Sequence, residues 1–129
     1  TRIAQEDLAE SLADAFQFVS HHHPPDFVRA LRRAWEAETH PPARAAMGQL
    51  LVNSKLAAQG RRPVCQDTGV GQVFFRVGCG VQFYRRDGSA PISLQAVANE
   101  GVRRAYSDPH NPLRATMVAD PLGRRINTR

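Results

Sequence analysis

Cysteine is scarce in this sequence, which has two in 129 residues, Cys65 and Cys79. Two cysteines are too few for a disulfide scaffold, although they could pair with each other. No apolar run approaches the roughly 20 residues that span a bilayer, and no signal peptide is evident. We therefore expect a cytoplasmic protein that does not contact a membrane, in a reducing compartment. In such a protein a cysteine is most often a small core residue.

Several motifs that would define a function are also missing. No Cys-x-x-Cys or His-x-x-x-His spacing supports a zinc site, and there is no Gly-x-Gly-x-x-Gly, phosphate-binding loop or nucleophile elbow. The run His21-His22-His23 precedes two prolines, so we expect it to end a helix. The chain begins at Thr1 and not at Met, which we interpret as the loss of something upstream.

The charge is positive and unevenly distributed. The net charge is +5, and all eleven basic residues after position 60 are arginines. Arginine presents a planar fork that suits carboxylates and phosphates, so an anionic partner is expected in the second half. A nucleic acid, a small dicarboxylate and a subunit contact all remain open. Base-stacking aromatic residues are not interleaved with Arg103 and Arg104, so we interpret these two as solvated residues of a helix face.

The pattern predicts a mixed α/β fold, with a helical N-terminal layer on a partial β-sheet. Residues 1–60 form the helical region, with three helices divided by Pro24-Pro25 and Pro41-Pro42 and ending at a Gly60 cap. The first helix has an apolar stripe of Leu8, Leu12, Ala15, Phe16 and Val19.

Residues 61–129 form an α/β region. Its expected elements are strands at 72–77 and 81–85, a turn at 85–89, and a helix capped by Ser93. The apolar face of that helix is Leu94, Val97, Ala98, Gly101, Val102 and Ala105.

Cys65 lies in the expected loop between the third helix and the first strand. An amide, a carboxylate and a hydroxyl follow it, at Gln66, Asp67 and Thr68. A reactive or metal-binding thiolate needs such a polar, partly open environment. Cys79 lies among valines and glycines, which is typical of a structural cysteine.

Several ordered stretches resemble the iron–sulfur-dependent (class I) fumarate hydratases and the related L-tartrate dehydratase alpha subunits. RPVCQDTG at residues 62–69 resembles the first cluster motif of that family. The likeness continues in VFFRVG at 73–78, in NEGVRRAY at 99–106 and in NPLRATMVADP at 111–121. It covers about half of the chain with specific motifs, and the helical first half fits more loosely.

The resemblance implies a hydro-lyase that reversibly hydrates fumarate to malate with a 4Fe–4S cluster held by three thiolates. Cys65 would be the first cluster ligand, and Gln66 would bind a substrate carboxylate. Asp67 would take part in proton transfer, and Arg114 would clamp a carboxylate through two hydrogen bonds. A beta domain or subunit would supply the other catalytic groups, and the enzyme would form a homo-oligomer.

The sequence departs from the family pattern in offering one plausible ligand where three are needed. We therefore expect an N-terminal fragment of the alpha region, which alone neither holds a stable cluster nor turns over substrate. The nearest alternative is an L-tartrate dehydratase alpha subunit, which uses the same chemistry. A non-catalytic basic module that binds nucleic acid is less favoured, and a folded gene remnant is the third alternative.

Overall fold

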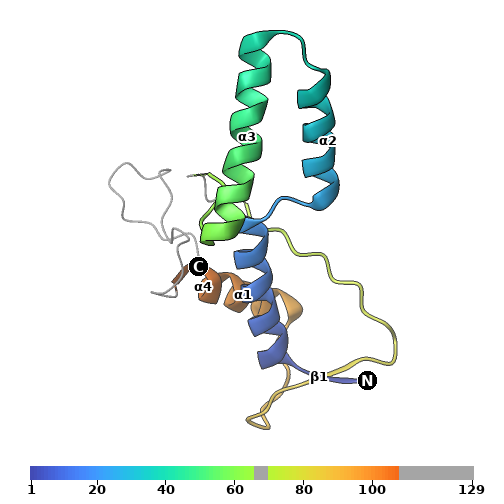
Figure 1. Ribbon diagram of the computed structural model, residues 1–129. Helices are drawn as coiled ribbons and strands as arrows, with labels where there is room; N and C mark the ends of the chain where they lie inside the picture. The colour runs from blue at the N-terminus through green and yellow to red at the C-terminus, as the bar shows by residue number, and fades with distance from the viewer. Residues whose placement is uncertain (66–69, 108–129) are drawn as a thin grey trace. The chain divides into compact units, whose positions relative to one another are not determined.

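The computed structural model describes residues 1–65 and 70–107 (Figure 1). The element order is β1 (Arg2–Ala4), α1 (Gln5–His21), α2 (Pro25–Ala37), α3 (Pro41–Gly60), β2 (Gln82–Tyr84) and α4 (Leu94–Ser107). The predicted mixed α/β fold, with a helical N-terminal region and a partial sheet, is confirmed. No helix in the described ranges is both long and apolar enough to cross a bilayer.

The chain divides into two compact units. The first contains Thr1–Gln17 and Asp67–Arg129, and the second contains Phe18–Gln66. Helix α1 begins in the first unit and its last turn belongs to the second. The predicted boundary between residues 60 and 61 follows the sequence order and stays a prediction.

The first unit packs small residues between α1 and α4. Its buried apolar residues are Ala4, Ala9, Ala13, Val97, Ala98 and Ala105. Gly101 of α4 approaches α1 so closely that a Cβ there would lie 2.7 Å from Leu12 Cβ and 3.1 Å from Ala9 O. The predicted α4 face is therefore correct. The predicted stripe on α1 is partly wrong, because Ala9 and Ala13 are buried whereas Ala15 and Val19 are exposed.

Side-chain hydrogen bonds from Ser93 and Gln5 hold the starts of α4 and α1 in this unit. The Ser93 hydroxyl accepts a hydrogen bond from the Ala96 N–H at 3.2 Å, which confirms the predicted cap of α4. The buried Gln5 amide donates to Ile92 O at 2.7 Å and accepts from Ile92 N–H at 2.8 Å. Strand β1 pairs in parallel with β2, with Ile3 opposite Phe83. The short β1 was missed, because three residues carry too little pattern to be predicted.

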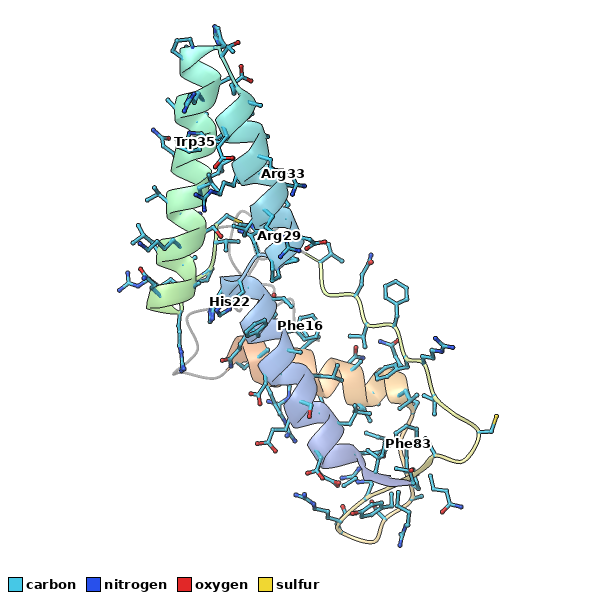
Figure 2. The ribbon with its side chains drawn as sticks, turned by 45° about the vertical axis from the view of Figure 1, so that its right-hand side comes forward. Phe16, His22, Arg29, Arg33, Trp35 and Phe83 are labelled. Carbon is cyan, nitrogen blue, oxygen red and sulfur yellow. The ribbon has the colours of Figure 1, made fainter. Side chains whose placement is uncertain are left out.

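The second unit is a helical hairpin. Proline begins both helices, at Pro25 and Pro41, where a fixed φ and a missing N–H cost little. Trp35 of α2 lies against α3 (Figure 2), with its indole Nε1 3.2 Å from the position of a Cβ on Gly48 and its ring 4.9 Å from the Arg44 guanidinium. Yet α2 buries no residue completely. The hairpin core is therefore thin.

Two local predictions are wrong. The left-handed residue after α3 is Arg61 (φ 48°, ψ 50°), and the helix continues through Gly60, which was expected to be the cap. Residues 72–77 do not form a strand. The predicted strand at 81–85 is confirmed as β2, and the turn at 85–89 is confirmed with Gly88 at φ 77°.

Candidate functional site

The candidate site is the loop that begins where α3 ends. The left-handed conformation of Arg61 turns the chain back on the helix, and the Arg62 N–H donates to Ala57 O at 3.1 Å. Such a bond satisfies one of the carbonyls that a helix C-terminus leaves without an intrahelical donor. The chain therefore leaves α3 in a defined direction toward Cys65.

The peptide groups of Val64 anchor the loop one residue before Cys65. Val64 N–H donates to Ser20 O, in the last turn of α1, at 2.9 Å. The Asn53 amide of α3 donates to Val64 O at 2.7 Å. The last turn of α1 and helix α3, both within the second unit, thus hold the backbone beside the cysteine. Asn53 and Ser20 were not predicted from the sequence. Each acts through a hydrogen bond to the backbone of Val64, and no sequence motif indicates such a contact.

The structure exposes both cysteines as thiols. For Cys65 this agrees with the environment that a metal-binding thiolate needs. For Cys79 the expectation of a structural core position is wrong, because Cys79 and Gly80 form an exposed turn before β2. The glycines on both sides have no side chain that could cover Cys79.

The other predicted site residues lie outside the described ranges. These are Gln66 and Asp67, which directly follow Cys65, and Arg114. Their roles stay predictions.

The histidine run ends α1, as predicted, beside the anchored loop. His21 is 6% exposed, and its Nε2 has no hydrogen-bond partner in the described part of the chain. Burial lowers the pKa of His21, and the neighbouring charges of His22 and Arg61 lower it further. His23 Nδ1 lies 3.1 Å from Ser54 Oγ of α3. Burial of the ring within the second unit therefore favours the neutral form of the His21 imidazole.

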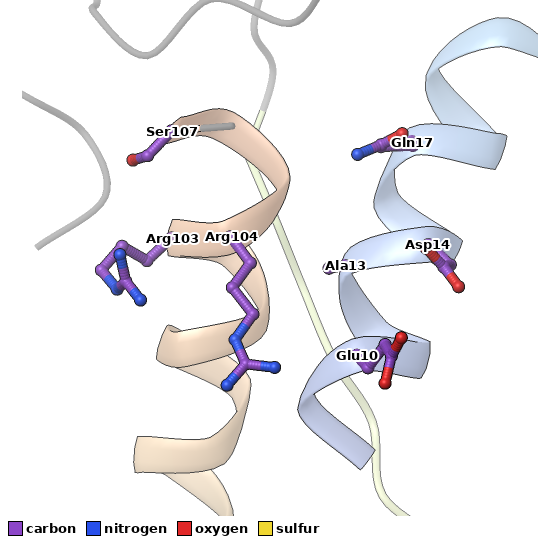
Figure 3. A pocket seen from close by; sticks show the side chains of 7 residues that line it. All are labelled: Glu10, Ala13, Asp14, Gln17, Arg103, Arg104 and Ser107. Atoms are coloured by element: carbon purple, nitrogen blue, oxygen red, sulfur yellow. The ribbon is translucent and has the colours of Figure 1, made fainter. Parts of the chain in front are cut away.

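A separate open groove of about 510 Å³ lies between α1 and α4 in the first unit (Figure 3). Helix α4 contributes Arg103, Arg104 and Ser107, and α1 contributes Glu10, Ala13, Asp14 and Gln17. Because the groove carries charges of both signs, it does not define an anion site.

Ion pairs engage four of the eleven arginines after position 60. Glu100 accepts hydrogen bonds from Arg103 and Arg104 at 2.7 to 2.8 Å, and these bonds lower the pKa of Glu100 to about 2. Arg85 lies 3.6 Å from Glu6, and Arg86 pairs with Asp7. Arg103 and Arg104 are partly exposed on the helix face, as predicted. Guanidiniums already paired in this way are poor evidence for a phosphate-binding surface.

The residues of this chain fit one ligand of a three-thiolate cluster. Cys65 has an exposed thiol on an anchored backbone. The sequence contains one other cysteine, Cys79, which belongs to the other compact unit. Within residues 1–65 and 70–107 no three His, Cys, Asp or Glu side chains gather as a metal site. A complete set of three thiolates would therefore need cysteines from outside these 129 residues.

Comparison with known proteins gives a class for this arrangement. Residues 9–129 match the family described as fumarate hydratase (Fumerase). The chain therefore belongs to the fumarate hydratase (Fumerase) family, as the sequence motifs predicted. A curated relative from Methanocaldococcus jannaschii, named "Putative L(+)-tartrate dehydratase subunit alpha", is 27% identical over 117 residues. That match covers 91% of this chain and 38% of the relative.

Proposed function

We propose that this chain is the part of a hydro-lyase alpha region that supplies the first thiolate of a 4Fe–4S cluster, in an enzyme that interconverts fumarate and malate. The observation that carries the proposal is the position of Cys65. Its thiol is exposed, and it directly follows Val64, whose N–H and C=O both form hydrogen bonds with helices. The chain that carries it matches the family over residues 9–129.

The cluster, when bound, would supply a Lewis-acidic iron that polarises the substrate hydroxyl. The protein's task is to orient a dianion and to move one proton. Hydration adds a hydroxyl to one alkene carbon and a proton to the other. We assign the proton transfer to Asp67, one carboxylate contact to Gln66 and a bidentate carboxylate contact to Arg114. Fixed cationic and hydrogen-bonding groups would stabilise the extra negative charge that develops beside a carboxylate.

A second subunit or domain is part of this proposal. The M. jannaschii relative is named as an alpha subunit, which supports a beta partner that completes the site. Exposed cysteines and a cluster suit a reducing compartment, and we propose the cytoplasm.

The test uses the full-length protein that contains this chain, reconstituted anaerobically with iron and sulfide. We expect Cys65→Ser to abolish the visible absorption of the cluster and its electron paramagnetic resonance signal after one-electron reduction, together with the bound iron. Cys79→Ser is the matched control, since it removes the other exposed thiol, and it should retain both signals. Loss of the cluster in Cys79→Ser with retention in Cys65→Ser would overturn the assignment.

The name of the relative favours a second candidate, dehydration of L-tartrate. Malate and tartrate differ by one hydroxyl, and both would be bound by the same residues. Parallel assays of the reconstituted enzyme, one following fumarate consumption and one following formation of the oxo-acid from L-tartrate, decide between them through the ratio of kcat/KM.

A further inference from the structure

His21 is a buried histidine that the proposed chemistry does not use. It is the last residue of α1, its side chain is 6% exposed, and its Nε2 has no hydrogen-bond partner within residues 1–65 and 70–107. A polar atom that is buried without a partner costs free energy, and native proteins keep few of them. A buried ring nitrogen of this kind points to a role for His21 that goes beyond filling space.

The residue before His21 makes the contact that holds the cysteine loop. Ser20 provides one of the last carbonyls of α1, which have no donor within their own helix. That carbonyl accepts the Val64 N–H at 2.9 Å, and Cys65 follows Val64 directly. Because Ser20 and His21 are neighbours in one helical turn, the position of the buried ring and the position of this carbonyl are set together.

The residues around His21 define the conformation of that turn. The His22 ring stacks on Phe18 with centroids 4.2 Å apart, and the His22 N–H donates to Phe18 O at 3.1 Å. Figure 2 labels His22 at the end of α1. His23 Nδ1 lies 3.1 Å from Ser54 Oγ of α3. Of the three consecutive histidines, His21 is the one with a fully buried side chain.

The surroundings of His21 disfavour a proton on its ring. Burial lowers the pKa of His21, and His22 and Arg61 lower it further. Arg61 is the left-handed residue that turns the chain out of α3 toward the loop. The α1 dipole favours a cation at this end of the helix, yet the pKa falls, so burial and these neighbours outweigh the dipole. Within residues 1–65 and 70–107, no carboxylate is among the charged groups that act on His21.

We propose that His21 is a positioning residue for Cys65, whose buried neutral ring keeps the last turn of α1 in place for the Ser20–Val64 hydrogen bond and whose protonation opens that bond. A protonated ring is stabilised by turning out into water, and the last turn of α1 must unwind to let it do so. Ser20 O then leaves the Val64 N–H, and the bond from Asn53 to Val64 O remains.

The direction of the pH effect follows from linkage. Because the pKa of His21 is lowered while the ring is buried, the open state binds the proton more tightly, and falling pH favours opening. In an enzyme with the proposed cluster, acid would therefore loosen the backbone of the first ligand. That last consequence rests on the proposed function, whereas the coupling between His21 and the loop does not.

Hydrogen exchange of the Val64 amide, in the full-length protein without a cluster, tests the coupling. This N–H is the donor of the anchoring bond, so its protection, corrected for the intrinsic effect of pH, reports the bond itself. From about pH 7.5 to about pH 5.5 we expect the protection of Val64 to fall about three- to tenfold in the parent. In His21→Phe it should not depend on pH, because phenylalanine fills the site without a titrating group.

Two further variants and a second amide complete the test. His40→Phe is the matched control, since it removes an exposed histidine of the same unit, and it should keep the pH dependence of the parent. His21→Gln, which also removes the titrating group, should behave like His21→Phe and replaces it if that variant does not fold. The amide of the buried Ala57 in α3 separates local from general opening, and its protection should fall less than that of Val64.

The proposal would be overturned by protection at Val64 that is independent of pH in the parent, or by an unchanged pH dependence in the folded His21 variants. Equal losses of protection at Val64 and Ala57 would also overturn it, because His21 would then support the whole unit and not the loop. The measurement needs no cluster, so such results would leave the thiolate assignment standing. Retention of the cluster in Cys65→Ser would reject the proposed function and leave the exchange result intact.

Discussion

The two compact units bury different amounts of apolar side chain. In the unit formed by Thr1–Gln17 and Asp67–Arg129, α1 and α4 meet through alanine and glycine, and Gln5 is joined to the Ile92 backbone by two hydrogen bonds. In the unit formed by Phe18–Gln66, large apolar side chains such as Leu50, Val52 and Leu56 remain more than half exposed. In the first unit, small residues let the two helices approach closely. The second unit contains large apolar side chains that it does not bury.

This difference predicts unequal local stability. Regions with few buried apolar contacts open at lower free energy than the rest of a domain. We therefore expect the amides of α2 and α3 to exchange with deuterium faster than those of α4. The following substitutions test that contrast, beginning with the largest effect.

Gly101→Ala should destabilise the first unit most. The added Cβ meets Leu12 Cβ at 2.7 Å and Ala9 O at 3.1 Å, and neither atom can move without the backbone of α1. Overpacking of this kind costs about 1–3 kcal/mol, and the helix propensity of alanine returns about 1 kcal/mol of that. We expect a net loss of about 1–2 kcal/mol in the free energy of unfolding, measured by urea denaturation.

Gly60→Ala is the control for that change, in the second unit. Its Cβ would meet the Arg62 Cγ at an ordinary 3.7 Å. Stability should stay the same or rise by up to about 1 kcal/mol. Equal losses in both variants would refute the close approach of α1 and α4.

Gln5→Ala should cost about 1 kcal/mol, because it removes both hydrogen bonds to Ile92. Because Ile92 is partly exposed, its backbone N–H and C=O can form hydrogen bonds with water in the variant, which limits the loss of stability. Gln95→Ala, which removes an exposed bond to Asn99, should change stability by less than about 0.5 kcal/mol. Thermal unfolding of the two variants side by side makes the comparison.

His21 should make the second unit sensitive to acid. Burial lowers the pKa of His21 below its ordinary value of 6.5, so the unfolded chain binds the proton more tightly. The stability contribution is complete above pH 6.5 and is lost as pH falls toward the lowered value. In His21→Phe this dependence should disappear, as judged by unfolding at about pH 5.5 and about pH 7.5. A variant that keeps the parent's slope would contradict the assignment.

Arg61→Gly should give the smallest change, and it should be a gain. Arg61 is the only non-glycine residue with positive φ in residues 1–65 and 70–107. Glycine removes a strain of about 1 kcal/mol but adds freedom to the unfolded chain, so we expect a gain of about 0.5 kcal/mol. Arg62→Gly, at a residue with ordinary φ, should lower stability. A matching gain there would exclude backbone strain as the cause.

The sequence predicted what local chemistry determines. Prolines located the starts of α2 and α3, and the Ser93 hydroxyl located the start of α4, because each acts on neighbouring backbone. The left-handed position was assigned to Gly60 by residue preference, and Arg61 occupies it because the helix has one more residue. Residues 72–77 have a strand pattern, but a strand also needs a partner.

The candidate site was predictable only at its centre. Cys65 stood out because an amide, a carboxylate and a hydroxyl follow it. The bonds that hold its loop join Val64 to Asn53 and to Ser20, far away along the chain. No periodicity connects such residues. The exposure of Cys79 was missed for the opposite reason, since apolar neighbours in sequence did not become neighbours in space.

The anchoring of Val64 has a consequence for how a metal would be captured. Helix packing places the cysteine backbone in advance, so a ligand at Cys65 need not order a loose loop, an entropy that would otherwise reduce its affinity. The affinity for iron would then depend on the stability of the α2–α3 hairpin. If Cys65 holds the proposed cluster, Asn53→Ala, which leaves the thiol untouched, should make the full-length protein release iron faster than the parent does. The thin core of α2 and α3 would in this way limit how long a cluster survives.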